Sequence, residues 1–290
     1  MSIATDSPDD VTEHGYDPGF LGVRVPLPDT GGRTVRTLPY AHFSVLLDPA
    51  RRLAALTAVN VDGARLVDLE RGDDWHLDPR VPEGEQVGGE LYARNDLDRG
   101  HLVRRRDPVW GTPGVASRAN LDTFAYPNAA PQASGFNQSK ELWLGLEDHV
   151  LEHARAHRQR ITVFTGPVLQ PDDPTYRGVQ LPLLFYKVVA WAVGGGADVR
   201  AAGFVLDQSS ELDEDDLARG VASDRVAGDP PPLGPFRTFQ VPVRDVAELT
   251  GIEFSQLAVV DALQPVPTAQ PPAGSAGAWL PLTVADDVAL

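Results

Sequence analysis

The chain has 290 residues, of which 42% are hydrophobic, and this is enough for one large globular domain or two small ones. Its formal net charge of −16 at pH 7 argues against a protein that coats nucleic acid, because affinity for phosphate normally needs a basic surface. The absence of cysteine excludes disulfides and thiolate metal sites. We see no apolar run of membrane-spanning length and no signal-peptide pattern, so we expect a cytoplasmic protein with no membrane partner.

The first elements along the chain are a tail and then a sheet. Residues 1–20 are polar and acidic, which is typical of a flexible tail. Residues 43–47 and 53–61 are β-prone runs separated by an Asp-Pro-Ala turn, and this pattern predicts a hairpin. Further β-prone runs predict the remaining strands at 161–165, 183–193, 201–206 and 239–243.

Two helices are expected among these strands. Apolar residues recur at spacings of three and four over residues 142–154, which predicts an amphipathic helix, and a shorter helix over 243–249 would end at Gly251. Residues 263–290 are rich in Pro and Ala and are expected to form a second tail. Strands from both halves of the chain around few helices favour a single α+β domain over 21–262.

Basic residues gather in one part of this acidic chain. Residues 91–118 contain six arginines and three aspartates, which gives this segment a charge of +3. Arginine offers a planar fork for phosphate, although a GC-rich genome would give the same preference for arginine over lysine. We predict that Arg94, Arg104 and Arg105 contact substrate phosphates, while a plain solvated charge run is the alternative for residues 104–106.

The most informative segment is Asp98-Arg99-Gly100-His101. A histidine can take a proton from water near neutral pH, and an arginine can stabilise the negative charge that develops on an attacked phosphorus. Gly100 would let the backbone approach a substrate closely or adopt a positive φ. The tetrapeptide alone is also what an ordinary surface turn contains, so it needs a second signal.

That second signal lies further along the chain, where the sequence resembles the DNA/RNA non-specific endonuclease family, the ββα-metal nucleases that include mitochondrial endonuclease G. The resemblance covers about residues 40–258. The motifs that carry it, in the family's order, are Asp98-Arg99-Gly100-His101, Asn128 with Pro131-Gln132, Asn137, and Trp143 with Leu146-Glu147.

The resemblance implies a ββα-metal core on a central, mainly antiparallel sheet and a one-metal hydrolysis of DNA and RNA. His101 would be the general base, and Asn137 the only direct protein ligand of Mg²⁺, for which Mn²⁺ could substitute. Arg99 would neutralise the transition state and Asn128 would hold the active-site geometry. The metal would stabilise the leaving 3′ oxygen and so give 5′-phosphate ends. Because this chemistry takes place on the backbone, neither base identity nor the 2′-hydroxyl would be required.

The position of the helical carboxylate departs from the family pattern. Glu usually lies eight residues after the metal-binding Asn, whereas Glu147 lies ten after Asn137. Two extra residues rotate a helical position by about 200°. Either an irregular first turn absorbs this difference and Glu147 serves as the catalytic-site carboxylate, or Glu141, four residues after Asn137, takes its place.

Other polar and aromatic residues have ordinary structural explanations beside functional ones. His149, His153 and His157 share one helical face and could bind zinc or nickel, but a solvated face is the simpler interpretation. Asp172 and Asp173 precede Pro174, which is typical of a turn. The indoles of three tryptophans could stack on bases or belong to the core, and Arg65 could reach a substrate; these tryptophans are Trp75, Trp110 and Trp191.

The alternative function is a catalytically silent nucleic-acid-binding or scaffold protein on the same fold. A sequence-specific nuclease would normally carry an added recognition module, and none is visible in the sequence. Members of the family are often homodimers, so we expect a homodimer here. A cytoplasmic nuclease must also be restrained, and we hypothesise an inhibitor protein, activation by assembly, or occlusion of the basic segment by the acidic stretch 207–216.

Overall fold

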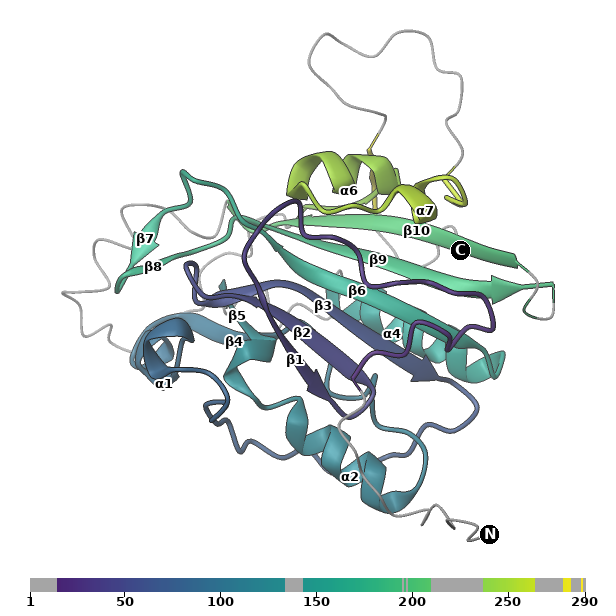
Figure 1. The fold of residues 1–290 in the computed structure, drawn as a ribbon, viewed down its shortest axis with the longest axis horizontal. Coiled ribbons are helices and arrows are strands. Elements are labelled where there is room, and N and C mark those ends of the chain that lie inside the picture. Colours follow the sequence, from purple (N-terminus) through teal and green to yellow (C-terminus); the bar gives the residue numbers. More distant parts are fainter. Residues whose placement is uncertain are drawn as a thin grey trace, which may run out of the picture.

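The computed structural model describes residues 15–133, 143–194, 196, 198–209, 237–263, 279–282 and 288, with the backbone alone for 143–149 and 237. An eight-stranded sheet runs through this described part, and every neighbouring pair in it is antiparallel (Figure 1). In spatial order its strands are β1 (Arg36–Tyr40), β2 (Phe43–Asp48), β3 (Leu53–Asp62), β6 (Arg160–Val168), β9 (Leu184–Val193), β10 (Asp198–Asp207), β11 (Arg237–Val241) and β12 (Leu280–Pro281).

The other elements connect these strands or lie on the two faces of the sheet. The described helices are α1 (Gly89–Tyr92), α2 (Pro113–Asp122), α4 (Trp143–Ala156), α6 (Val243–Thr250) and α7 (Ser255–Ala258), with 3-10 turns η1 (Glu83–Glu85) and η2 (Tyr126–Asn128). Two small sheets complete the fold, made of β4 (Leu97–His101) with β5 (Ala129–Ala133) and of β7 (Thr175–Tyr176) with β8 (Val179–Gln180).

The central strands are covered on both faces, because alternate side chains of a strand point to opposite sides. Along β9, Phe185 and Val189 belong to one buried cluster, together with Leu151 of α4. Tyr186 and Val188 belong to the other cluster, which also contains side chains of α6 and α7. Figure 1 shows α6 and α7 on one side of the sheet and β4, β5 and α4 on the other. The site described below therefore lies on the α4 face.

Helix α4 is placed on the sheet by a close backbone approach at the end of β3. A Cβ on Gly63 would lie 2.1 Å from the carbonyl oxygen of Ala154, so a larger residue does not fit there. The Gly63 N–H donates to the carbonyl of Gln159 at 3.0 Å, just beyond the end of the helix. This contact fixes the C-terminal end of α4 against β3.

Most of the predicted elements are confirmed, and so is the α+β class with a mainly antiparallel sheet. The predicted hairpin is β2–β3, and the predicted helices are α4 and α6. Gly251 ends α6 in the left-handed region at φ 70°, which a glycine adopts without strain. The strands β6, β9, β10 and β11 coincide with the other β-prone runs.

The prediction that residues 1–20 form a tail is wrong for residues 15–20. The side chains of Tyr16 and Phe20 are buried in the cluster on the α6 face. The Tyr16 N–H donates to Ser44 Oγ at 2.9 Å, and the Tyr16 hydroxyl donates to the carbonyl of Val25 at 2.7 Å. Burial of a Phe-sized side chain contributes roughly 1.5–3 kcal/mol, which offsets the cost of ordering a residue or two.

The tail predicted at 263–290 is likewise wrong for residues 279–282. Strand β12 pairs with β11, so that Phe239 faces Pro281. The Trp279 indole lies 5.4 Å from the Phe239 ring and donates from Nε1 to Asp245 at 3.0 Å. Within the described ranges, no helix is long and apolar enough to cross a bilayer.

Candidate active site

The Asp98-Arg99-Gly100-His101 motif and the Pro131-Gln132 motif lie side by side in the small sheet β4–β5. The strands pair antiparallel, with His101 opposite Ala129, Arg99 opposite Pro131 and Gly100 opposite Ala130. Helix α4 is the next described element along the chain. The unit is therefore a pair of strands, with α2 and η2 inserted between them in the chain, followed by helix α4. This unit lies on the α4 face of the large sheet, where Ala130 and Leu97 belong to the same buried cluster as Leu151.

Gly100 is required by a close side-chain contact. Its φ is not among the positive φ values of the described glycines, so the second of the two expected reasons for glycine, a positive φ, is wrong here. A Cβ on Gly100 would instead lie 2.0 Å from Oε1 and 2.1 Å from Cδ of Gln132. Gln132 is buried, and its side chain lies over the glycine on the same face of the small sheet. The absence of a side chain at Gly100 therefore leaves the space that the Gln132 side chain of the other motif occupies.

Asn128 fixes the backbone that follows His101. Its Oδ1 accepts from the N–H of Val103 at 2.9 Å, and its Nδ2 donates to the carbonyls of Val103 and Thr123, both at 3.0 Å. The side chain has no exposed surface. Both amide hydrogens are used in these bonds, so Asn128 acts on the site through the backbone and offers no donor to a substrate.

The imidazole of His101 lies among aromatic rings and positive charges. Its ring centroid is 4.7 Å from Trp75 and 5.2 Å from Phe124. Nε2 is buried and has no hydrogen-bond partner among the residues that the structure describes. Burial, followed by the nearby charges of Arg71, Arg105 and Arg99, lowers the pKa of His101 to about 3. The ring is therefore neutral at pH 7 and able to accept a proton.

Two arginines beside His101 have guanidinium groups that form no hydrogen bond or ion pair with another described residue. Arg99 lies with Cζ 5.4 Å from the centroid of the Trp75 ring, and no hydrogen bond or ion pair joins it to another described residue. Arg71 is exposed, acts on the pKa of His101, and likewise has no such bond within the described ranges. Of the three arginines that lower the pKa of His101, these two have no described hydrogen bond or ion pair.

The other predicted arginines have different surroundings. Arg105 donates from Nη1 to the carbonyl of Leu69 at 3.1 Å and to Asn120 at 3.0 Å, so part of its guanidinium holds the local structure. Arg104 is half-buried. Arg94 is exposed between α1 and β4 at φ 57°, and no described contact joins it to His101. The structure thus gathers Arg99 and Arg105 around the histidine but not Arg94.

Arg106 belongs to a network of exposed ion pairs. It contacts Asp68 and Glu152, each at 3.3 Å, and Arg155 contacts Asp68 at 3.0 Å. This network joins the segment that bears Arg71 to the chain after β4 and to helix α4. Exposed pairs contribute little to stability individually. Together, these pairs link the three segments to one another.

Several predicted residues lie where the structure leaves their roles untested. Asn137 and Glu141 are outside the described residues, and for Glu147 only the backbone, within α4, is described. His149 has no described side chain. The rings of His153 and His157 lie 4.2 Å apart, and the described residues contain no group of three potential metal ligands.

The remaining candidates have structural roles. Asp173 is buried and accepts from the guanidinium of Arg51 and from the N–H of Gln170, which closes a turn. Trp110 and Trp191 are buried in the core. Arg65 lies over the Trp110 ring, with Cζ 5.3 Å from its centroid.

Three residues of the site were not found by sequence reasoning as parts of one arrangement. Arg71 lies in an irregular polar segment with no motif, and nothing in its spacing to His101 marks it. Trp75 was weighed as a core residue or a base-stacking residue, and it instead packs on His101 itself. Phe124, which completes the contact, also gave no signal, because proximity across more than twenty residues is decided by tertiary packing.

Two antiparallel strands followed by a helix, supported on a large antiparallel sheet, define the ββα-metal nuclease class of fold. A solved chain with this architecture comes from the crystal structure of the EndoG/EndoGI complex, which bears on the mechanism of EndoG inhibition. The two superpose with a TM-score of 0.56 over 77% of this chain and 87% of that one, at 19% identity. At this identity the likeness concerns the fold alone.

The sequence profile of the DNA/RNA non-specific endonuclease family matches residues 25–260, and this chain belongs to that family. A curated relative is the uncharacterized protein y4fB of Sinorhizobium fredii (strain NBRC 101917 / NGR234), which is 41% identical over 263 residues. The match takes in 83% of this chain but only 39% of the relative. The chain therefore spans about two fifths of the length of that relative.

Proposed function

We propose that this chain is a Mg²⁺-dependent endonuclease that hydrolyses DNA and RNA with little preference for sequence or sugar, with His101 as the general base. The observation that carries the proposal is the neutral imidazole of His101, whose buried Nε2 has no partner among the described residues, beside the guanidinium groups of Arg71 and Arg99. A buried polar atom without a partner calls for an explanation, and a bound water or substrate group supplies one.

The reaction follows from these side chains. His101 takes a proton from a water molecule as the water oxygen attacks phosphorus and the bond from phosphorus to the 3′ oxygen breaks. The 3′ oxygen leaves as a hydroxyl after taking up a proton, and the phosphate stays on the 5′ end. Arg99 and Arg71 stabilise the extra negative charge on the phosphate oxygens in the transition state.

A divalent metal fits this site only through residues beyond those described. The proposed ligand is the amide oxygen of Asn137, a type of donor that Mg²⁺ accepts together with several water molecules. The described residues contain no group of three potential metal ligands. When bound, Mg²⁺, or Mn²⁺ in its place, supplies positive charge to the leaving oxygen. Glu147 or Glu141 would hold the water around it.

Substrate breadth follows from the atoms that the site addresses. Arg71 and Arg99 offer donors to phosphate oxygens, and phosphate contacts carry no sequence information. The proposal includes a homodimer and a restraining partner, the latter by analogy with the complex of EndoG and EndoGI. Occlusion by the acidic stretch 207–216 is a second route to restraint, and residues 210–216 of that stretch lie outside the described residues.

The test is digestion of supercoiled plasmid and of a structured RNA by the wild-type chain and His101→Ala. We expect cutting of both substrates with Mg²⁺, no cutting with EDTA, and a loss of about 10²- to 10⁴-fold in rate for His101→Ala. His157→Ala, which removes an exposed histidine of α4's C-terminal end, is the matched control and should keep full activity. A wild-type protein that retards DNA on a gel without cutting it would instead be the silent binding protein.

A further inference from the structure

Catalytic histidines are commonly oriented by an acceptor that takes a hydrogen bond from the second ring nitrogen. For His101 the buried Nε2 has no hydrogen-bond partner within the described ranges, so this nitrogen does not orient the ring. Its ring instead contacts Trp75 at 4.7 Å with an interplanar angle of 53°, and the edge of Phe124 at 5.2 Å and 84°. We propose that Trp75 is the positioning residue that orients the His101 imidazole by packing, and that the hydrogen-bonded anchor around Asp78 holds Trp75 in place.

Trp75 contacts both of the groups that the proposed reaction uses. His101 and Arg99 are two residues apart on β4 and therefore point to the same side of the strand. The Trp75 ring lies against the imidazole and also beneath the Arg99 guanidinium, at 5.4 Å. One indole thus sets the separation of the base from the cation, and the proposal deepens the proposed function in this way.

The indole is itself enclosed by aromatic rings. Phe124 meets it edge-on at 5.4 Å and 81°, and Tyr126 lies 5.7 Å away at 35°. The backbone next to Trp75 is paired to the same segment: the His76 N–H donates to the Phe124 carbonyl at 3.1 Å, and the Tyr126 N–H donates to the His76 carbonyl at 2.9 Å. These contacts align Trp75 with Phe124, but they leave this irregular segment without a link to the large sheet.

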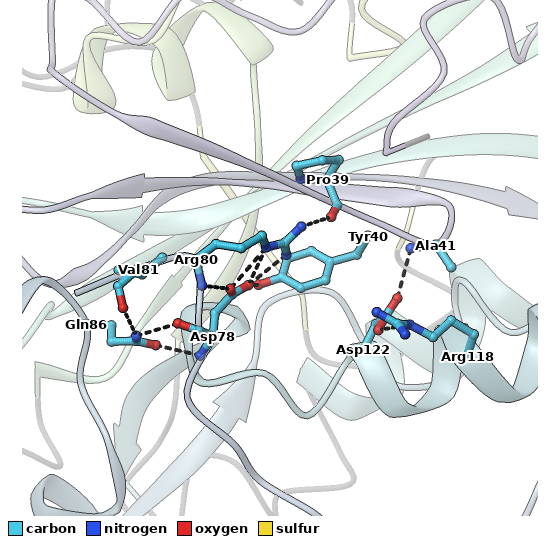
Figure 2. A network of polar contacts seen from close by, with 9 residues as sticks. All are labelled: Pro39, Tyr40, Ala41, Asp78, Arg80, Val81, Gln86, Arg118 and Asp122. Carbon is cyan, nitrogen blue, oxygen red and sulfur yellow. Dashed lines mark hydrogen bonds and ion pairs between the residues drawn. The ribbon is translucent and has the colours of Figure 1, made fainter. Parts of the chain in front are cut away.

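Asp78, three residues after Trp75, provides that link (Figure 2). Its side chain is buried, and its Oδ2 accepts from the hydroxyl of Tyr40, on edge strand β1, at 2.6 Å. The Arg80 guanidinium donates to the same carboxylate from Nε at 3.0 Å and from Nη2 at 2.7 Å. The side chain of Gln86 accepts from the Asp78 N–H and donates to the Asp78 carbonyl, both at 2.9 Å.

A buried carboxylate with this many partners holds its segment in one geometry, because each lost partner leaves charge unsatisfied. Tyr40 keeps its ring contacts without the hydroxyl: it stacks on Phe43 at 4.8 Å, and Arg80 lies over it at 4.8 Å. Tyr40→Phe therefore keeps these ring contacts and removes the hydroxyl that bonds to Asp78 and contacts Arg80. It tests the anchor without emptying the core.

The experiment compares Trp75→Leu, Trp75→Phe and Tyr40→Phe in plasmid-cleavage kinetics, with Trp191→Phe as a buried tryptophan control. Since displacement of a catalytic group by about 1 Å can cost about 10²-fold, we expect Trp75→Leu to lower kcat by more than about tenfold with KM within about threefold. Trp75→Phe should recover most of the loss, and Tyr40→Phe should lower kcat in the same way but less. A smaller loss in Trp75→Leu, or a Phe variant no better than the Leu variant, overturns the proposal.

A second readout does not depend on activity. In wild type, the NMR signals of the His101 imidazole should be those of one fixed ring orientation, and in Trp75→Leu the ring should titrate closer to an ordinary histidine because water reaches it. If the wild-type protein does not cut nucleic acid, the proposed function fails while this measurement still tests the packing. If Trp75→Leu does not fold, Tyr40→Phe decides: unchanged kcat and an unchanged His101 signal overturn the anchor.

Discussion

At His101, burial of the ring and the charges of three nearby guanidinium groups all lower the pKa of the imidazole. Each disfavours the imidazolium form, so each lowers the pKa, and burial has the largest effect. A histidine next to an arginine in the sequence already predicted a base that works near neutral pH. The sequence did not indicate how far the pKa falls, because that depends on Trp75 and Phe124, which approach the ring only in the folded chain.

The first prediction concerns the pH dependence of cleavage. The base is active when neutral, and it is neutral above its pKa. Because the pKa of His101 is lowered, to about 3, the kcat/KM of the free enzyme should stay level as pH falls through about 6.5, where an ordinary histidine loses activity. The measurement is kcat/KM from about pH 4.5 to 8.5 at constant ionic strength.

The Arg71→Gln variant provides the internal check on the cause. Removal of this positive charge should raise the pKa of His101, and NMR titration of the imidazole follows this change below the pH range of the cleavage assay. An acid limb centred at or above about 6.5 in the wild type would show that the ring is solvated in the working enzyme.

At the scale of elements, the antiparallel pairing of β4 with β5 brings the two motifs together. Their register puts Gly100 opposite Ala130, which is two residues along β5 from Gln132, so that Gly100 and Gln132 share one face of the small sheet. The motif residues were predictable from the sequence, but their mutual fit was not. The expected reasons for glycine were a close approach to a substrate or a positive φ, whereas the structure shows that the missing Cβ makes room for Gln132.

The second prediction is that Gly100→Ala destabilises the fold and lowers activity. The new Cβ would overlap Gln132, and overpacking of a buried site costs about 1–3 kcal/mol. Thermal unfolding should show a lowered Tm. Gly114→Ala in α2, where a Cβ meets no atom within 4 Å, is the matched control and should not lose stability.

A second change distinguishes crowding from strain. Gln132→Ala combined with Gly100→Ala removes the overlapping side chain and should recover part of the lost stability. No recovery in the double variant would mean that Gly100 is needed for its backbone.

Sequence reasoning found the elements with a strong periodic signal and missed those made by distant pairing. Helix α4 and strands β2, β3, β6 and β9 have apolar patterns long enough to read. Strand β1 contains Pro39, which belongs on an edge strand and obscures its pattern. Strand β12 is two residues long and is a strand only because β11 lies next to it. The segment that carries Arg71 and Trp75 has no regular structure, so only tertiary contacts place it.

At the scale of the whole molecule, a small positive site lies in a chain of net charge −16. Several arginines of the basic segment are not free to bind phosphate: Arg106 is paired with Asp68 and Glu152, and Arg105 holds Leu69 and Asn120. Beside His101, Arg99 of this segment and Arg71, which precedes the segment, have no hydrogen bond or ion pair to a described residue, whereas the exposed Arg94 has no described contact with His101. Pairing within the fold, which the sequence does not show, therefore occupies part of the basic segment.

The third prediction is a shallow dependence on salt. Two phosphate contacts give a slope of about −1.8 in a plot of log(kcat/KM) against log[salt], so a rise from about 50 to 200 mM should lower kcat/KM about twelvefold. Arg71→Gln should reduce the slope by about 0.9. Arg200→Gln, at an exposed arginine of β10, is the control and should keep the wild-type slope. An Arg71→Gln slope equal to that of the wild type would remove Arg71 from the phosphate contacts.

The pairing of β12 with β11 bears on how the protein can be shortened. The proline- and alanine-rich composition after residue 263 makes this a natural place to truncate the chain. A chain cut there would lack Trp279 and strand β12 at the edge of the sheet. The backbone groups of β11 and the ring of Phe239 would then face solvent as an open edge. Such an edge recruits strands from neighbouring molecules, so the trimmed protein would tend to self-associate even with its active site intact.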